Sequence, residues 1–165
     1  MKTISIEVSG GCQCGAVRYH ATEMLDNAHL CHCRMCQKAV GNIFAALVAA
    51  PDDKLKWTRG KPAIFKSSDH AERGFCADCG TPLFYNSLVH DRVNLTIGSL
   101  DHPEKFPPVM QMGTESRVPW FAGITEVESY GETTAYAGDQ AVQSIKTSNW
   151  QHPDHDTINW TPKTD

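Results

Sequence analysis

Seven cysteines fall into three short clusters, and they are the residues of this chain best suited to chemistry. The clusters are Cys12-Gln13-Cys14, Cys31-His32-Cys33-Arg34-Met35-Cys36 and Cys76-Ala77-Asp78-Cys79. Alternate residues of an extended chain point to the same side, so each C-x-C pair can aim two sulfurs at one ion. A C-x-x-C pair followed by glycine is typical of a zinc knuckle, because the tight turn brings its two sulfurs together. The clusters therefore predict metal binding.

Zinc suits these ligands best, because it accepts thiolates in a tetrahedral arrangement and has no redox chemistry of its own. Iron–sulfur ligation is the alternative, but no cluster has the four-cysteine spacing of a ferredoxin. A disulfide framework is disfavoured, because the number of cysteines is odd and the first residues carry no apolar leader. The same observation favours a cytoplasmic protein with reduced thiols.

Two closed four-cysteine sites would need one sulfur more than the chain has. One division uses every sulfur. In it, a closed, structural zinc is bound by Cys12, Cys14, Cys76 and Cys79. It leaves Cys31, Cys33 and Cys36 for a second zinc whose fourth position is open. Three protein ligands with an exchangeable fourth are the pattern of a catalytic zinc. We therefore expect two zinc ions per chain, with these last three cysteines as the catalytic ligands.

A histidine is the other candidate for the fourth ligand of the second site. His29 lies two residues before Cys31 and would share its face, whereas His32 would point to the opposite face. His70, His90 and the histidines of the C-terminal stretch would have to arrive through folding. The sequence leaves the fourth ligand open.

The elements that must position these cysteines are mainly strands. Alternation of polar and apolar residues predicts strands at residues 4–8, 16–20 and 93–97, and the apolar run 43–49 predicts a buried strand. A hairpin is expected over residues 54–66, with Arg59-Gly60-Lys61-Pro62 as its turn. Helical signals are scarce: residues 34–40 are expected to form a short helix that ends at Gly41, and Asp139 is expected to cap another through Ile145. The polar stretch 149–165 carries two tryptophans, which favours its draping over the surface. We expect one mainly β domain with few short helices.

The composition narrows the classes of partner. The chain has 165 residues, of which 41% are hydrophobic and 21% charged, values typical of a globular protein. Its longest apolar run, residues 43–50, is too short to span a bilayer. Fifteen basic and 19 acidic residues give a net charge of -4, which offers no electrostatic reason to bind nucleic acid. A small molecule is the expected partner, with neither membrane nor nucleic acid involved.

Three motifs in order resemble the glutathione-dependent formaldehyde-activating enzyme family, which also includes the centromere protein V domain. The motifs are the run Gly10-Gly11-Cys12-Gln13-Cys14-Gly15-Ala16-Val17-Arg18-Tyr19, the Cys31 cluster followed by Gly41 and Phe44, and Phe75-Cys76-Ala77-Asp78-Cys79-Gly80-Thr81-Pro82-Leu83. The pieces Gly98-Ser99-Leu100-Asp101 and Arg117-Val118-Pro119-Trp120 fit the same pattern, although Val109 to Met112 stand where many relatives have a histidine. The resemblance covers about residues 4–130, which leaves residues 131–165 as a C-terminal extension packed on, or fraying from, the same domain.

The resemblance implies a zinc-stapled, mainly β fold of the MSS-four-like kind, with the same division of cysteines. It also implies a carbon–sulfur lyase that forms S-hydroxymethylglutathione from glutathione and formaldehyde, or acts on another small carbonyl. Arg34 and Lys38 are the best candidates to hold the carboxylates of glutathione, because they flank the open site; Arg18, Arg73 and Arg117 are further ones. A non-catalytic zinc-stapled binding module and a lyase for a different thiol adduct remain the alternatives.

Overall fold

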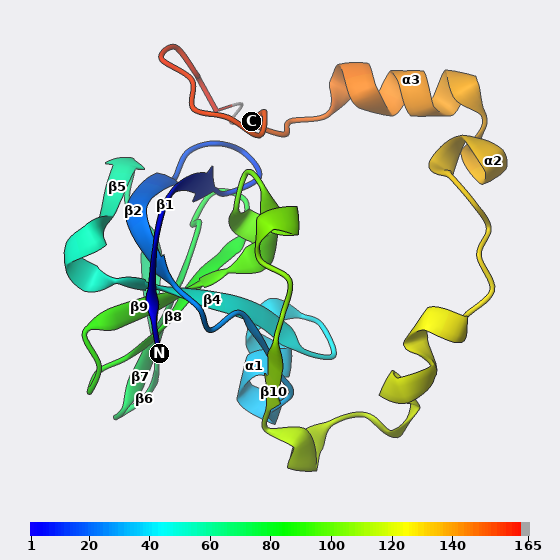
Figure 1. Ribbon diagram of the computed structural model, residues 1–165. Helices are drawn as coiled ribbons and strands as arrows, with labels where there is room; N and C mark the ends of the chain where they lie inside the picture. Colours follow the sequence, from blue (N-terminus) through cyan, green and yellow to red (C-terminus); the bar gives the residue numbers. More distant parts are fainter. Residues whose placement is uncertain (163–165) are drawn as a thin grey trace.

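Two β-sheets and a few short helices make up residues 1–162, the part of the chain that the computed structural model describes (Figure 1). The smaller sheet has the order β1-β2-β5, with β1 at Thr3–Gly11, β2 at Arg18–Leu25 and β5 at Leu55–Arg59. The larger sheet has the order β10-β3-β4-β9-β8-β7-β6. Its strands are β3 (His29–Cys31), β4 (Ala45–Pro51), β6 (Ala63–Ser68), β7 (Ala71–Phe75), β8 (Pro82–Ser87), β9 (Arg92–Thr96) and β10 (Met110–Met112). Among the strands of residues 1–162, only β10 pairs in parallel, with β3.

The helices are short. The α-helices are α1 (Arg34–Val40), α2 (Thr133–Ala137) and α3 (Asp139–Ser148). The 3₁₀ turns are η1 (Asp52–Lys54), η2 (Ile97–Ser99), η3 (Pro103–Lys105), η4 (Thr114–Ser116) and η5 (Pro119–Glu126). The helix predicted over residues 34–40 is confirmed, and it ends at Gly41 in the left-handed conformation that glycine adopts without strain. The helix predicted from Asp139 is also present, but its N-cap is Gly138 and it continues to Ser148.

The core lies between the two sheets, as the mainly β prediction requires. Tyr19 and Met24 of β2 and Leu95 of β9 are completely buried. Strand β4 runs through the middle of the larger sheet, and Leu47 to Ala50 are almost free of solvent contact, which explains their unbroken apolar run. Each strand expected from alternation is present within a few residues of its predicted bounds.

The predicted hairpin over residues 54–66 is wrong. Strand β5 pairs with β2 in the smaller sheet, whereas β6 pairs with β7 in the larger one. The turn between them therefore carries the chain from one sheet to the other. Gly60 has a φ of +55°, and a Cβ there would lie 2.2 Å from the carbonyl oxygen of Ala16. A turn signal marks a change of direction, but it does not specify which strand the next segment will pair with.

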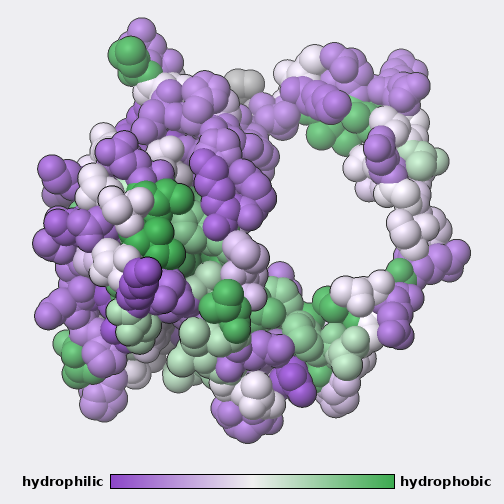
Figure 2. Space-filling model, viewed as in Figure 1, coloured by the Kyte–Doolittle hydropathy of each residue, from purple (hydrophilic) through white to green (hydrophobic). Residues whose placement is uncertain are grey.

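After β10 the chain leaves the sheets and returns to them through a long arc. Figure 1 shows this arc running through η5, α2 and α3, and Figure 2 shows an opening between it and the body of the molecule. The last described residues pack back on the loop after β1: the indole nitrogen of Trp160 donates to the carbonyl oxygen of Cys14 at 2.8 Å. Trp160 therefore packs on this loop, whereas Trp150 is 45% exposed. Residues 163–165 of the predicted extension lie outside the described part.

No helix within residues 1–162 combines the length and the apolar character needed to cross a membrane.

Candidate metal centres

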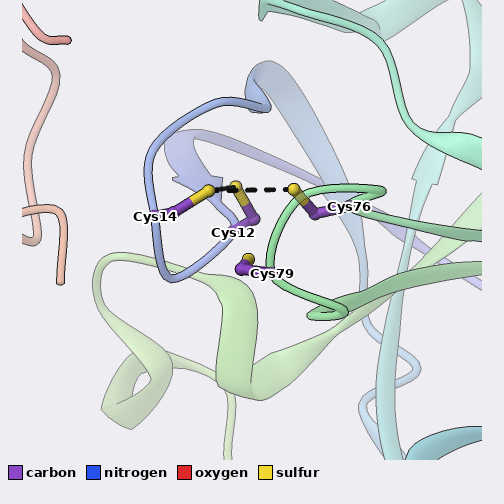
Figure 3. A group of neighbouring side chains, drawn as sticks. All are labelled: Cys12, Cys14, Cys76 and Cys79. Atoms are coloured by element: carbon purple, nitrogen blue, oxygen red, sulfur yellow. Dashed lines mark hydrogen bonds between the residues drawn. The ribbon is translucent and has the colours of Figure 1, made fainter. Parts of the chain in front are cut away.

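Four cysteines from two distant segments converge where the two sheets meet (Figure 3). Cys12 and Cys14 lie in the loop after β1, and Cys76 and Cys79 lie in the turn between β7 and β8. Their four Sγ atoms all lie within 4.8 Å of one another; Cys12 and Cys14 are 3.6 Å apart, and Cys14 and Cys76 are 3.8 Å apart. A tetrahedral zinc with Zn–S bonds of about 2.3 Å places its sulfurs about 3.8 Å apart. This group, called the junction site below, therefore fits zinc.

The surroundings of Cys12 and Cys14 at the junction site disfavour their thiolate forms when no cation is present. Burial raises the pKa of both Cys12 and Cys14, since it disfavours the charged form. The backbone amide of Val17 donates to Cys12 Sγ at 3.2 Å, an orientation that suits a thiolate. The Cys76 turn is closed by a hydrogen bond from the amide of Gly80 to the Cys76 carbonyl. A metal ion would supply the positive charge that these buried sulfurs lack.

The other three cysteines meet at the start of α1. Cys31 is the last residue of β3, Cys33 caps α1 and Cys36 lies in its first turn. The three Sγ atoms lie within 4.8 Å of one another, and Cys31 and Cys33 are 3.5 Å apart. Gly113 packs directly against this group, called the cavity site below; a Cβ on Gly113 would lie 2.7 Å from the Cys33 amide nitrogen. The three-sulfur spacing again fits zinc.

No histidine, aspartate or glutamate among residues 1–162 joins the three sulfurs of the cavity site within that distance. His32 is fully buried on the other side of the chain, where it packs on Phe121 and shares a hydrogen bond with Gln111. The Nδ1 of His29 contacts the carbonyl oxygen of Asn27 at 2.7 Å. The structure thus brings the seven cysteines together as four and three, the division expected from their number.

A cavity of about 310 Å³ opens at the three-cysteine group. It is lined by all three cysteines, by His29 and His90, and by other residues that include members of β8, β9 and β10. Met110 and Met112 stand on its β10 side. The cavity site is therefore open to a small molecule, while three of the four junction cysteines are buried.

Arg73 contacts the cavity site directly, a contact that the sequence did not reveal. Its guanidinium donates to Cys36 Sγ at 3.4 Å and lies 5.0 Å from the ring centre of Tyr85. The hydrogen bond from Cys31, followed by that from Arg73, lowers the pKa of Cys36 to about 5. Arg73 was only one of five candidate cations, because its neighbour Cys36 comes from a segment 37 residues away.

Three other candidate cations for the substrate carboxylates lie in two different environments. Arg34 and Lys38 lie on α1 and line a larger groove beside the cavity site, and Arg34 also donates to the Gln37 side chain. Arg18 is instead buried in a paired contact with Asp101, at 2.7 and 2.6 Å, and binds Asp156 as well. Arg18 therefore holds the C-terminal segment to the core.

The family model of the glutathione-dependent formaldehyde-activating enzyme matches residues 7–116, two thirds of the chain and both cysteine groups. The chain belongs to this family. A solved structure from Rhodobacter sphaeroides has the same fold, with a TM-score of 0.53 over 63% of this chain and 99% of the other. The two sequences are 23% identical, so this likeness supports the fold alone. Family membership indicates an enzyme. Residues 117–162, which form most of the arc and the C-terminal segment, lie outside the matched residues.

Proposed function

We propose that this protein is a zinc-dependent carbon–sulfur lyase that combines a glutathione-type thiol with formaldehyde or another small carbonyl. The observation that carries the proposal is the contrast between the two cysteine groups. Four sulfurs meet at the junction of the sheets, whereas three sulfurs face a cavity with no fourth protein ligand among the described residues. A closed group suits a structural metal, and an open one suits chemistry. Membership of the family supports the same division.

A zinc ion held by Cys31, Cys33 and Cys36 would bind the substrate sulfur as a thiolate and keep it nucleophilic. In the proposed reaction a bond forms between this sulfur and the carbonyl carbon, and the thiol proton ends on the carbonyl oxygen. The reverse reaction breaks the same bond, and neither direction needs an oxidant or a reductant. The cavity would hold the two reactants side by side, and this proximity supplies much of the rate enhancement.

Cations near the cavity have distinct proposed roles. Arg73 offsets the negative charge that accumulates when a fourth sulfur joins three cysteinates, because it already contacts Cys36. Arg34 and Lys38 would bind the substrate carboxylates from α1. Residues 4–130 would form the zinc domain, and residues 131–165 an extension, of which His152 and Trp160 pack on the loop of the junction site.

Cobalt-substituted protein tests the proposal, because its visible spectrum reports the ligands of the metal. Glutathione should change this spectrum, whereas S-methylglutathione, which has the same shape but no free thiol, should not. Glutathione should also speed S-hydroxymethylglutathione formation above the uncatalysed background. Cys33→Ser should lose both effects and keep the junction metal. A spectrum that glutathione leaves unchanged would rule out the proposed substrate sulfur.

A further inference from the structure

A groove of about 850 Å³ adjoins the cavity site, and formaldehyde is far too small to account for it. One side of the groove is α1, and its floor comes from β4, β6, β7, β8 and β9. Pockets of this size accommodate molecules of a few hundred Å³ or more, lined by apolar side chains with a few polar ones. The groove thus has room for a substrate with a sizeable organic group.

The walls of the groove are apolar and leave large side chains in solvent. Met35 of α1 is 58% exposed, Ile64 of β6 is 52% exposed and Phe65 of β6 is 61% exposed. Apolar side chains gathered at a concave surface are a mark of a binding site, because the free energy of the system falls when a ligand removes them from water. A polar tripeptide such as glutathione would leave much of this apolar surface uncovered.

Charge in the groove has one sign. Arg34, Lys38 and Arg73 line it, and no acidic residue does. This pattern suits a ligand that carries an anionic group in addition to its apolar part.

The groove and the cavity site share a wall. Met35, Leu47, Arg73 and Tyr85 line both spaces. Arg73 also contacts Cys36, so a ligand that reaches this arginine from the groove is next to the three sulfurs. One molecule is therefore able to occupy the groove and present a sulfur to the cavity site.

We propose that the groove binds an amphipathic organic thiol, or its carbonyl adduct, whose hydrocarbon part lies over Ile64 and Phe65. Its anionic group pairs with Lys38, because the Arg34 guanidinium already donates to the Gln37 side chain, and its sulfur enters the cavity site. This inference rests on the proposed function, since it assigns the sulfur to the same metal. It narrows the substrate class to a thiol acid that is more apolar than glutathione.

A series of thiols that differ in chain length or in the charge of the head group tests this substrate class on cobalt-substituted, full-length protein. The probes are 3-mercaptopropionate, 6-mercaptohexanoate and the neutral 6-mercaptohexanol. Each buried methylene strengthens binding about three- to fourfold. We expect 6-mercaptohexanoate to bind about tenfold or more tightly than 3-mercaptopropionate, since an open groove buries the chain only in part. We also expect it to bind more tightly than 6-mercaptohexanol.

Matched variants separate the two parts of the groove. Phe65→Ala should remove most of the advantage of the longer chain, whereas Leu88→Ala, an exposed apolar residue that does not line the groove, should not. Lys38→Gln should remove the preference for 6-mercaptohexanoate over 6-mercaptohexanol. Lys66→Gln is its control, because Lys66 is exposed, pairs with Asp69 and does not line the groove.

The outcomes distinguish the inference from the proposed function. If no thiol changes the cobalt spectrum, the proposed function fails and the inference fails with it. If all three thiols bind equally, or Phe65→Ala and Leu88→Ala behave alike, the inference fails while the proposed function stands. Sedimentation that shows a dimer dissociating in Phe65→Ala would also overturn it, because the groove would then be a contact between two copies.

Discussion

Arg73 is the residue whose environment distinguishes the cavity site most clearly from the junction site. It is 8% exposed, it contacts Cys36, and it stacks on Tyr85. A buried guanidinium next to a cluster of thiolates stabilises negative charge that water would otherwise have to solvate. The junction site has no equivalent among its hydrogen bonds, where backbone amides and Thr81 contact the sulfurs.

We predict that Arg73→Met weakens thiol binding at the cavity site by about 10- to 100-fold, since a hydrogen bond to a charged group contributes about 1.5–3 kcal/mol. Arg73→Lys should restore part of the loss, because it keeps the charge. The measurement is the dissociation constant of 2-mercaptoethanol from the cobalt-substituted protein. Arg92→Met is the control, since Arg92 lines the same cavity. An equal effect of both methionine variants would mean that Arg73 acts only through general charge.

The cysteine clusters were predictable at the residue scale, whereas the role of Arg73 was not. Spacing within Cys31-His32-Cys33 and Cys76-Ala77-Asp78-Cys79 is local, and local spacing determines which sulfurs can converge. The contact between Arg73 and Cys36 depends instead on the pairing of β7 with β8 and on the position of α1. A single sequence contains little information about such distant pairing.

The junction site connects elements that would otherwise touch through side chains alone. Cys12 and Cys14 follow β1 of the smaller sheet, and Cys76 and Cys79 lie between two strands of the larger sheet. Structural zinc contributes about 10–16 kcal/mol to folding in small domains. That contribution is as large as the whole stability of a typical domain, which is about 5–15 kcal/mol.

Cys76→Ser should therefore make the protein insoluble or lower its melting temperature sharply. Cys36→Ser should leave a folded protein, because the three sulfurs of the cavity site come from β3 and the adjoining start of α1. Thermal unfolding and metal content of the two variants test this difference. Equal loss of stability would show that the cavity site is structural as well.

The C-terminal segment packs on the junction site through His152, which is 4% exposed. Its amide donates to the carbonyl oxygen of Gln13, and its ring packs against Trp160 at 4.7 Å between centres. Burial, followed by the charge of Arg18, lowers the pKa of His152. The folded protein therefore favours the neutral ring, and the segment contributes its full stability above the ordinary histidine pKa of about 6.5.

We predict that this segment loosens as the pH falls below about 6.5, because the unfolded form then binds more protons than the folded one. Hydrogen exchange of residues 152–160, corrected for the intrinsic rate, should increase between pH 7.5 and 5.5. His152→Gln cannot take up the proton and should remove this pH dependence. A His152 ring that titrates above pH 6.5 in an NMR experiment would contradict the prediction.

At the scale of the whole molecule, the sequence predicted the class of fold but not how its two sheets are connected. Alternation identified β1 and β9, the continuous apolar run identified β4, and the Gly41 signal located the end of α1. Turn chemistry at Gly60 suggested a hairpin, although β5 and β6 belong to different sheets. Strands β7 and β8, which present the Cys76 turn, escaped prediction because their pattern is interrupted by Gly74 and Pro82. The groove beside α1 could not be foreseen, since it is formed by five strands of the larger sheet.

The central claim is that one zinc has four cysteine sulfurs and the other has three with a place for a substrate sulfur. X-ray absorption at the zinc edge of protein loaded with two zinc ions measures the average number of sulfur ligands. We predict about 3.5 sulfurs per zinc without thiol, from four at one site and three at the other, and about four with a saturating thiol. An average that the thiol leaves unchanged, or a histidine nitrogen already bound in its place, would contradict the claim.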